Sequence, residues 1–104
     1  MKSTQMEARE LAAPAVLGLD TRVQFREAAV QVLNGMPEGG GALVIDLTGT
    51  RTVDSAGLGV LMLIHRHAAD RRLSVVLKHP NDELRFLLAL TKLDALFEVD
   101  TAYR

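Results

Sequence analysis

Residues 42–63 read ALVIDLTGTRTVDSAGLGVLML and combine two different patterns of apolar residues. The first six, 42–47, form a short and almost unbroken apolar run, which is typical of a strand covered on both faces. From Leu58 to Ala69 apolar residues recur at the spacing of a helix that packs against a core. The stretch therefore predicts a buried strand, a turn and a helix, with Ser55 where the turn meets the helix.

The segments that follow continue this alternation. Residues 73–77 (LSVVL) predict a strand, residues 82–91 predict a helix with Asn81 as its N-cap, and residues 97–99 predict a short last strand. A strand–helix–strand–helix–strand order implies parallel pairing through right-handed crossovers.

The first third of the chain is patterned less clearly. Residues 21–24 (TRVQ) fit a capping box that opens a helix running to Leu33. Before them, residues 6–11 and 15–19 read as two short strands of a hairpin that is broken near Pro14. The expected fold class is α/β, a small mixed sheet of roughly four to five strands with about four helices packed on it.

Composition limits the kinds of partner. With 104 residues, 48% of them hydrophobic and 24% charged, a single globular domain over residues 1–104 is expected. The net charge of −1 argues against nucleic acid and anionic membranes, although Arg66, Arg71 and Arg72 leave a local basic patch open. The lack of cysteine excludes disulfides and thiolate metal sites. Without a signal-peptide pattern or an apolar run near the roughly 20 residues that span a bilayer, we expect a cytoplasmic protein without membrane insertion.

Ser55 lacks the neighbours that serine catalysis requires. The G-x-S-x-G elbow of hydrolases is incomplete in V-D-S-A-G, and His65 and His67 lie roughly 15 Å or more along the same predicted helix. Gly57 and Gly59 complete neither a Walker A loop nor G-x-G-x-x-G. Histidines two residues apart on a helix point in different directions, so one is expected to be half-buried and the other solvated. No catalytic, cofactor-binding or metal-binding residue is predicted, and we do not expect an enzyme.

Two features of the helix start need an explanation. Asp54 or Ser55 is expected to cap the helix by accepting hydrogen bonds from free amides of its first turn. A cap does not require Gly57 and Gly59, each of which costs a helix about 1 kcal/mol relative to alanine. The glycines either permit tight helix–sheet packing or leave the backbone around Ser55 open to another surface, and the sequence allows both.

Taken together, these motifs resemble the central signature of STAS domains, the fold of anti-sigma factor antagonists. In that family an apolar strand ends in D-L-S-G, and I/V-D-S-x-G-L then opens the second helix; this chain has D-L-T-G and V-D-S-A-G-L. Residues 73–99 resemble the family's next strand, helix and closing segment, and residues 18–33 are similar to its G-E-L-D segment and first helix. The chain departs from the family in a loop one residue shorter at residues 18–20, and in Lys92 where T-G-L-D has glycine. The lysine predicts a helix end that is either strained or not left-handed.

The resemblance implies a phosphorylation switch in a bacterial regulatory protein. In the family, a partner that is both anti-sigma factor and serine kinase phosphorylates the serine that matches Ser55. The unphosphorylated protein binds that partner and frees the sigma factor, and a separate serine phosphatase restores the serine. Asp54 is read as a cap and a kinase-recognition residue. The expected partner-binding surface comprises Asp20, Thr21, Arg22, Arg51, Thr52, Asp54, Ala56, Gly57 and Leu58 around Ser55.

Other members of the family leave alternatives open. STAS subunits of lipid-transporting ABC systems also carry V-D-[ST]-x-G-L and dock on an ATPase, and further STAS domains serve as scaffolds in stress-sensing complexes. Apolar residues around Leu58, Met62 and Phe86 are expected to be exposed, which suits a monomer or a weak homodimer.

Overall fold

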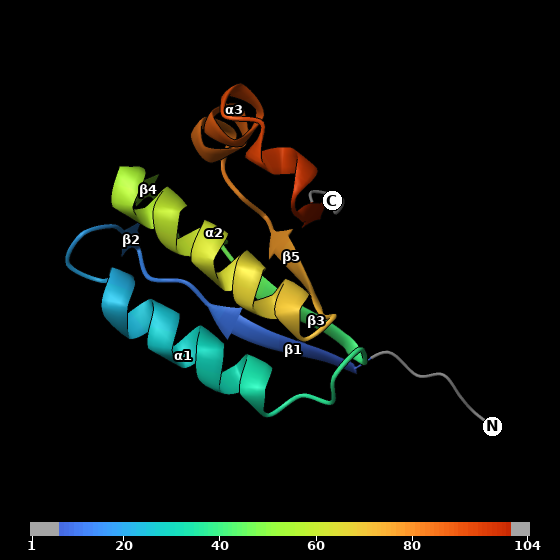
Figure 1. Ribbon diagram of the computed structural model, residues 1–104. Coiled ribbons are helices and arrows are strands. Elements are labelled where there is room, and N and C mark those ends of the chain that lie inside the picture. Colours follow the sequence, from blue (N-terminus) through green and yellow to red (C-terminus); the bar gives the residue numbers. More distant parts are fainter. Residues whose placement is uncertain (1–6, 101–104) are drawn as a thin grey trace.

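The computed structural model describes residues 7–100, in which strands and helices alternate along the chain (Figure 1). The helices are α1 (Arg22–Asn34), α2 (Ser55–Asp70), α3 (Asp82–Leu90) and the short 3₁₀ helix η1 (Leu93–Ala95). The strands are β1 (Glu7–Ala12), β2 (Val16–Leu17), β3 (Gly41–Asp46), β4 (Thr52–Val53), β5 (Ser74–Lys78) and β6 (Glu98–Asp100). The strands and helices predicted after residue 20 are confirmed to within a few residues at their ends; Met6, the start of the first predicted strand, lies outside the described residues.

The main sheet has the order β1-β3-β5-β6, and every neighbouring pair in it is parallel. The expected parallel pairing of the later strands is confirmed, whereas the expectation of a mixed sheet is wrong for the described strands. Each strand of this sheet is followed by a helix before the next one, and such a crossover returns the chain in the same direction.

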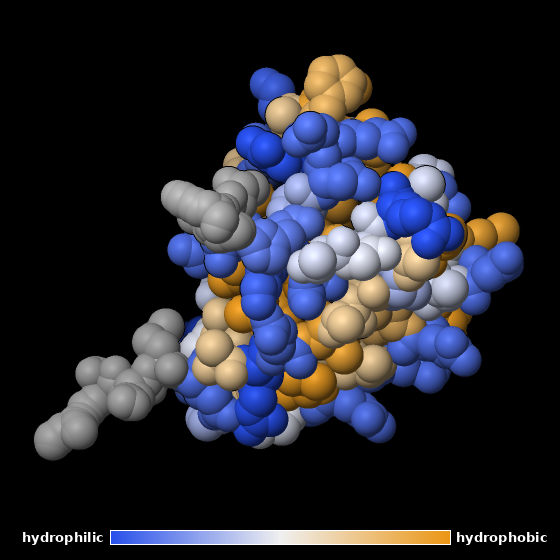
Figure 2. Space-filling model, turned by 180° about the vertical axis from the view of Figure 1, so that it is seen from behind, coloured by the Kyte–Doolittle hydropathy of each residue, from blue (hydrophilic) through white to orange (hydrophobic). Residues whose placement is uncertain are grey.

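Two helices, α1 and α2, lie side by side over one face of the sheet (Figure 1). On β3, Leu43 and Ile45 are fully buried, while Ala42 and Val44 are only half-buried. Successive strand residues point to opposite faces, so β3 is well covered on one face and not on both as its apolar run suggests. Figure 2 views the molecule from behind, where hydrophilic and hydrophobic side chains are interspersed.

The predicted N-terminal hairpin is wrong. β1 pairs with β3, and β2 pairs in parallel with β4 in a separate two-stranded sheet. The chain breaks at Pro14 but continues forward: the Ala13 amide donates to the Asp46 carbonyl at 2.9 Å, and the Ala15 carbonyl accepts from the Arg51 amide at 2.8 Å. Both segments therefore pair with strands that come later in the sequence, and a hairpin between them is not formed.

The sequence makes predictions about three helix ends, and the structure confirms some of them and not others. Asn81 caps α3 as predicted, because its side-chain oxygen accepts from the Leu84 amide at 2.8 Å. Thr21 precedes α1 without a side-chain cap, since its hydroxyl donates to the Val16 carbonyl at 2.8 Å, so the predicted capping box is wrong. Lys92 follows α3 in a left-handed conformation with φ of 62°, which agrees with a strained helix end.

The three neighbouring arginines do not form one exposed patch. Arg66 and Arg72 are exposed, but Arg71 is half-buried. Its Nε donates to the Leu33 carbonyl at 3.0 Å and its Nη2 to the Met36 carbonyl at 2.8 Å. Arg71 therefore joins the end of α2 to the end of α1, which fixes the two helices against each other over the sheet.

Candidate functional site

Ser55 is the first residue of α2 and its side chain is exposed. Asp54 is the N-cap: its backbone is extended, and its Oδ1 accepts from the Gly57 amide at 2.9 Å. The Ser55 hydroxyl makes no hydrogen bond to another residue in the part of the chain that is described, so it points freely from the start of the helix. The cap is thus Asp54, and Ser55 is left exposed beside it.

Asp54 also connects two segments that are far apart in the sequence. Its Oδ2 accepts from the Leu19 amide at 3.3 Å, and its own amide donates to the Leu17 carbonyl at 3.2 Å. A Cβ at Gly18 would overlap the Asp54 carboxylate, so a larger residue there would displace this carboxylate. The loop that leads into α1 is therefore held against the start of α2.

The pKa of the Asp54 carboxyl lies below its ordinary value. The largest cause is the hydrogen bond from the Gly57 amide, and the Leu19 and Ala56 amides and the positive charge of Arg22 add to it, against a smaller opposing effect of desolvation. Asp54 is consequently ionised at neutral pH. Ser55 thus sits beside a fixed negative charge at the positive end of a helix.

The predicted partner-binding residues gather around the starts of α1 and α2. Asp20 and Arg22 are exposed beside the loop held by Asp54, and Arg51 and Thr52 are exposed on the chain that leads into Asp54. The Thr21 hydroxyl makes its hydrogen bonds within the loop before α1: it donates to the Val16 carbonyl and accepts from the Gly18 amide at 3.0 Å.

Four members of the predicted set are not fully exposed. Gly57 is buried, Thr21 and Ala56 are half-buried, and Leu58 is half-buried against the core. Leu58 is also the exception among the apolar residues expected to be exposed, since Met62 and Phe86 are exposed on α2 and α3 respectively.

The two glycines of α2 have different surroundings. A Cβ at Gly57 would overlap the Leu17 carbonyl oxygen and lie 2.8 Å from Cγ1 of Val53, so this glycine permits β2 and β4 to pack closely on the helix. The idea that Gly57 opens the backbone to a visiting surface is wrong. At Gly59 a Cβ would meet nothing within 4 Å, so this position is open.

Gly59 lies in a hollow between α1 and α2 that the sequence did not reveal. We call it the α1–α2 groove; its volume is about 320 Å³, and it is lined by Arg22, Val23, Arg26, Ala56, Gly59, Val60 and Leu63. Ala56 directly follows Ser55, so the groove begins beside the serine. Recognising it needs the pairing of α1 with α2, which periodicity within each helix does not supply.

The two histidines of α2 are each in contact with another side chain. The His65 ring packs edge-on against Phe97 with centroids 5.5 Å apart, and His67 Nε2 lies 2.8 Å from the Asn34 side-chain oxygen. Both histidines are half-buried, so the expectation that one is solvated is wrong. Over residues 7–100, no cluster of three or more residues suited to hold a metal is found, and no helix is long and apolar enough to cross a membrane.

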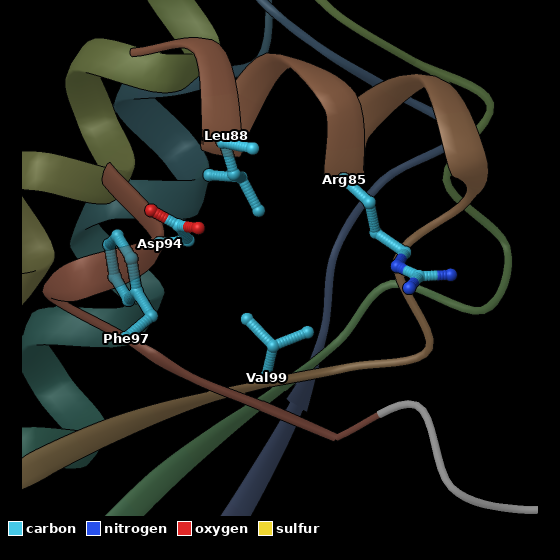
Figure 3. A pocket seen from close by; sticks show the side chains of 6 residues that line it. Arg85, Leu88, Asp94, Phe97 and Val99 are labelled. Atoms are coloured by element: carbon cyan, nitrogen blue, oxygen red, sulfur yellow. The ribbon is translucent and has the colours of Figure 1, made fainter. Parts of the chain in front are cut away.

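A second hollow of about 420 Å³ lies under α3 (Figure 3). Arg85 on α3 and Asp94 on η1 lie on opposite sides of it, Phe97 lies beside Asp94, and Leu88 and Val99 lie between the two sides. It includes neither Ser55 nor any of the predicted partner-binding residues.

Comparison with known proteins identifies the kind of domain. Residues 2–98 match a family model described as "Mlab, STAS domain". A STAS-domain containing protein of Pseudomonas aeruginosa (strain UCBPP-PA14) is 32% identical over 56 residues. Those residues are 54% of this chain, and they span only about half, 55%, of the relative's own length.

Several solved structures share the fold. A Thermotoga maritima protein described as a candidate anti-sigma factor antagonist has a TM-score of 0.76 at 21% identity, covering 94% of this chain and 84% of that one. The anti-sigma factor antagonist SpoIIAA in its unphosphorylated form gives 0.69 at 14%, covering 98% and 86%. A sulfate transporter family protein from Wolinella succinogenes gives 0.73 at 14%, covering 96% and 81%. At these identities the likeness shows the fold alone, and the expected STAS fold is confirmed.

Proposed function

The chain belongs to the STAS domain family, and we propose that it is an anti-sigma factor antagonist switched by phosphorylation of Ser55. In its unphosphorylated form it binds an anti-sigma factor that is also a serine kinase. Phosphorylation of Ser55 dissociates this complex, and a serine phosphatase removes the phosphate again. The protein acts in the cytoplasm as a substrate and binding module, without catalytic activity of its own.

The observation that carries this proposal is the state of Ser55. It is exposed at the first position of α2, its hydroxyl has no hydrogen-bond partner among residues 7–100, and the capping task belongs to Asp54. A kinase can therefore modify the hydroxyl without breaking an internal contact. The two antagonists among the structural neighbours agree with this function, although their likeness concerns the fold.

The expected effect of a phosphate follows from its charge. It adds about −1.5 to −2 charges at a helix N-terminus, where free amides and the helix dipole stabilise an anion. The fold therefore stays intact. The new charge lies beside ionised Asp54 on the surface that the partner has to desolvate, and binding is weakened by repulsion.

The test incubates the protein with ATP and an anti-sigma factor that has serine kinase activity, and reads the product by intact-mass spectrometry. We expect one added phosphate on the wild type and on Ser74→Ala, a control at another exposed serine, and none on Ser55→Ala. Equal labelling of Ser55→Ala would show that the site is elsewhere.

A second measurement tests the switch itself. Ser55→Asp is expected to keep the melting temperature of the wild type and to lose binding to the anti-sigma factor in titration calorimetry. Stable binding to an ABC-transporter ATPase that is insensitive to Ser55→Asp would contradict the proposal and point to a transporter subunit instead.

A further inference from the structure

The α1–α2 groove has the exposed apolar surface of a protein-binding site. Val23 on α1 and Leu63 on α2 both line the groove, and each is 49% exposed. Gly59 leaves space between them, since nothing lies within 4 Å of where its Cβ would be. Contiguous apolar side chains rimmed by polar residues mark interaction surfaces.

The charges that line the groove have one sign. Arg22 and Arg26 lie four residues apart on α1, and therefore on the same face, and no carboxylate lines the groove. Arg22 is electrostatically coupled to Asp54, whereas Arg26 forms no hydrogen bond or ion pair with another residue of the described range. A complementary partner surface carries carboxylates next to apolar side chains.

We propose that the α1–α2 groove binds an acidic amphipathic helix of the partner. A helix can lie in the furrow between two packed helices, with apolar side chains at every third or fourth position entering over Gly59 between Val23 and Leu63. Its carboxylates face Arg22 and Arg26. The proposal rests on the proposed function for the role of Ser55: a phosphate at the mouth of this groove would repel the same acidic helix.

The experiment needs neither kinase nor phosphate. A phage-displayed library of 16-residue helical peptides, with charged residues varied at the surface positions, is selected for binding to the full-length protein. The affinity of the enriched peptides is then measured for the wild type and for the variants. We expect enriched peptides to be acidic on one side and apolar on the other. Arg26→Glu should weaken their binding about tenfold or more, because it places a like charge in the groove. Arg85→Glu, which changes an exposed arginine on α3, should leave it unchanged.

A second variant tests the groove by shape. Gly59→Leu places an apolar side chain in the groove at a position where an added Cβ meets nothing within 4 Å, so it should keep the wild-type melting temperature and lose peptide binding. Three results would overturn the proposal: no enrichment, enrichment of basic peptides, or binding that survives both Arg26→Glu and Gly59→Leu. Self-association lost in Gly59→Leu would also overturn it, since the occupant would then be a second copy of the chain. Each of these results leaves the labelling of Ser55 unaffected, so failure here is separate from failure of the switch.

Discussion

One carboxylate, that of Asp54, organises the candidate site. Its two oxygens accept from Gly57 in α2 and from Leu19 in the loop before α1, so it both caps a helix and holds a neighbouring loop. These hydrogen bonds favour the charged form and lower the pKa of the carboxyl. A group whose pKa is lower in the folded state stabilises the fold above its unfolded pKa, and this contribution is lost as the pH falls through the folded pKa.

We predict that Asp54 contributes to stability at neutral pH and not in acid. Asp54→Ala should lower the melting temperature at pH 7 by several degrees, because the Gly57 and Leu19 amides lose their acceptor. Asp54→Asn keeps one acceptor and loses the charge, so its difference from wild type in unfolding free energy should shrink between pH 7 and pH 3. Urea titrations at both values measure this. A difference that does not change with pH, or an equal loss in the exposed control Asp70→Asn, would contradict the prediction.

At the scale of single residues, the sequence predicted those hydrogen bonds that join residues close together in the chain. A cap at Asp54 or Ser55 follows from the residue types at a helix start, and so does the cap at Asn81. The bond from Asp54 to Leu19 spans 35 residues, and no local pattern indicates it. No local pattern indicates the bond of Thr21 either, whose hydroxyl donates to the Val16 carbonyl instead of capping α1.

At the scale of the element, α2 owes its two glycines to different neighbours. Gly57 is in contact with β2 and β4, whereas Gly59 opens into the α1–α2 groove. The sequence left close packing and openness as alternatives, and each proved right for one glycine. Which glycine does which depends on where β2 passes, and β2 lies there because it pairs with β4 and not with β1.

We predict opposite effects of alanine at these two positions. Gly57→Ala inserts a methyl group into packed backbone and should destabilise the protein by about 1–3 kcal/mol. Gly59→Ala meets nothing, and should stabilise it by about 0.5–1 kcal/mol through helix propensity. The pair changes the same atoms in the same helix, so each variant is the control for the other in urea unfolding. Equal effects of the two substitutions would be inconsistent with the packing described.

At the scale of the whole molecule, the site lies at one end of a well-packed layer. α1 and α2 cover the sheet through fully buried side chains of β3 and β5, and Arg71 joins their far ends. The last part of the chain is held less firmly, since α3 contributes only Leu84 and Leu88 to the buried residues of the core. A site built on the firm layer suits a surface that changes its charge while its backbone stays in place.

We therefore predict two patterns of amide hydrogen exchange. In the wild type, β3 and β5 should exchange slowest, because each has a neighbouring strand on both sides, and residues 82–100 should exchange faster.

In Ser55→Asp the exchange of α1, β3 and β5 should match the wild type, because the added charge sits at an exposed helix start whose dipole accommodates it. Gly57→Ala serves as the positive control, since displacing α2 from β2 should speed exchange in both elements. If Ser55→Asp sped exchange across α2 and β2 as Gly57→Ala does, the switch would work by local unfolding, and loss of binding could not be attributed to charge at an intact surface.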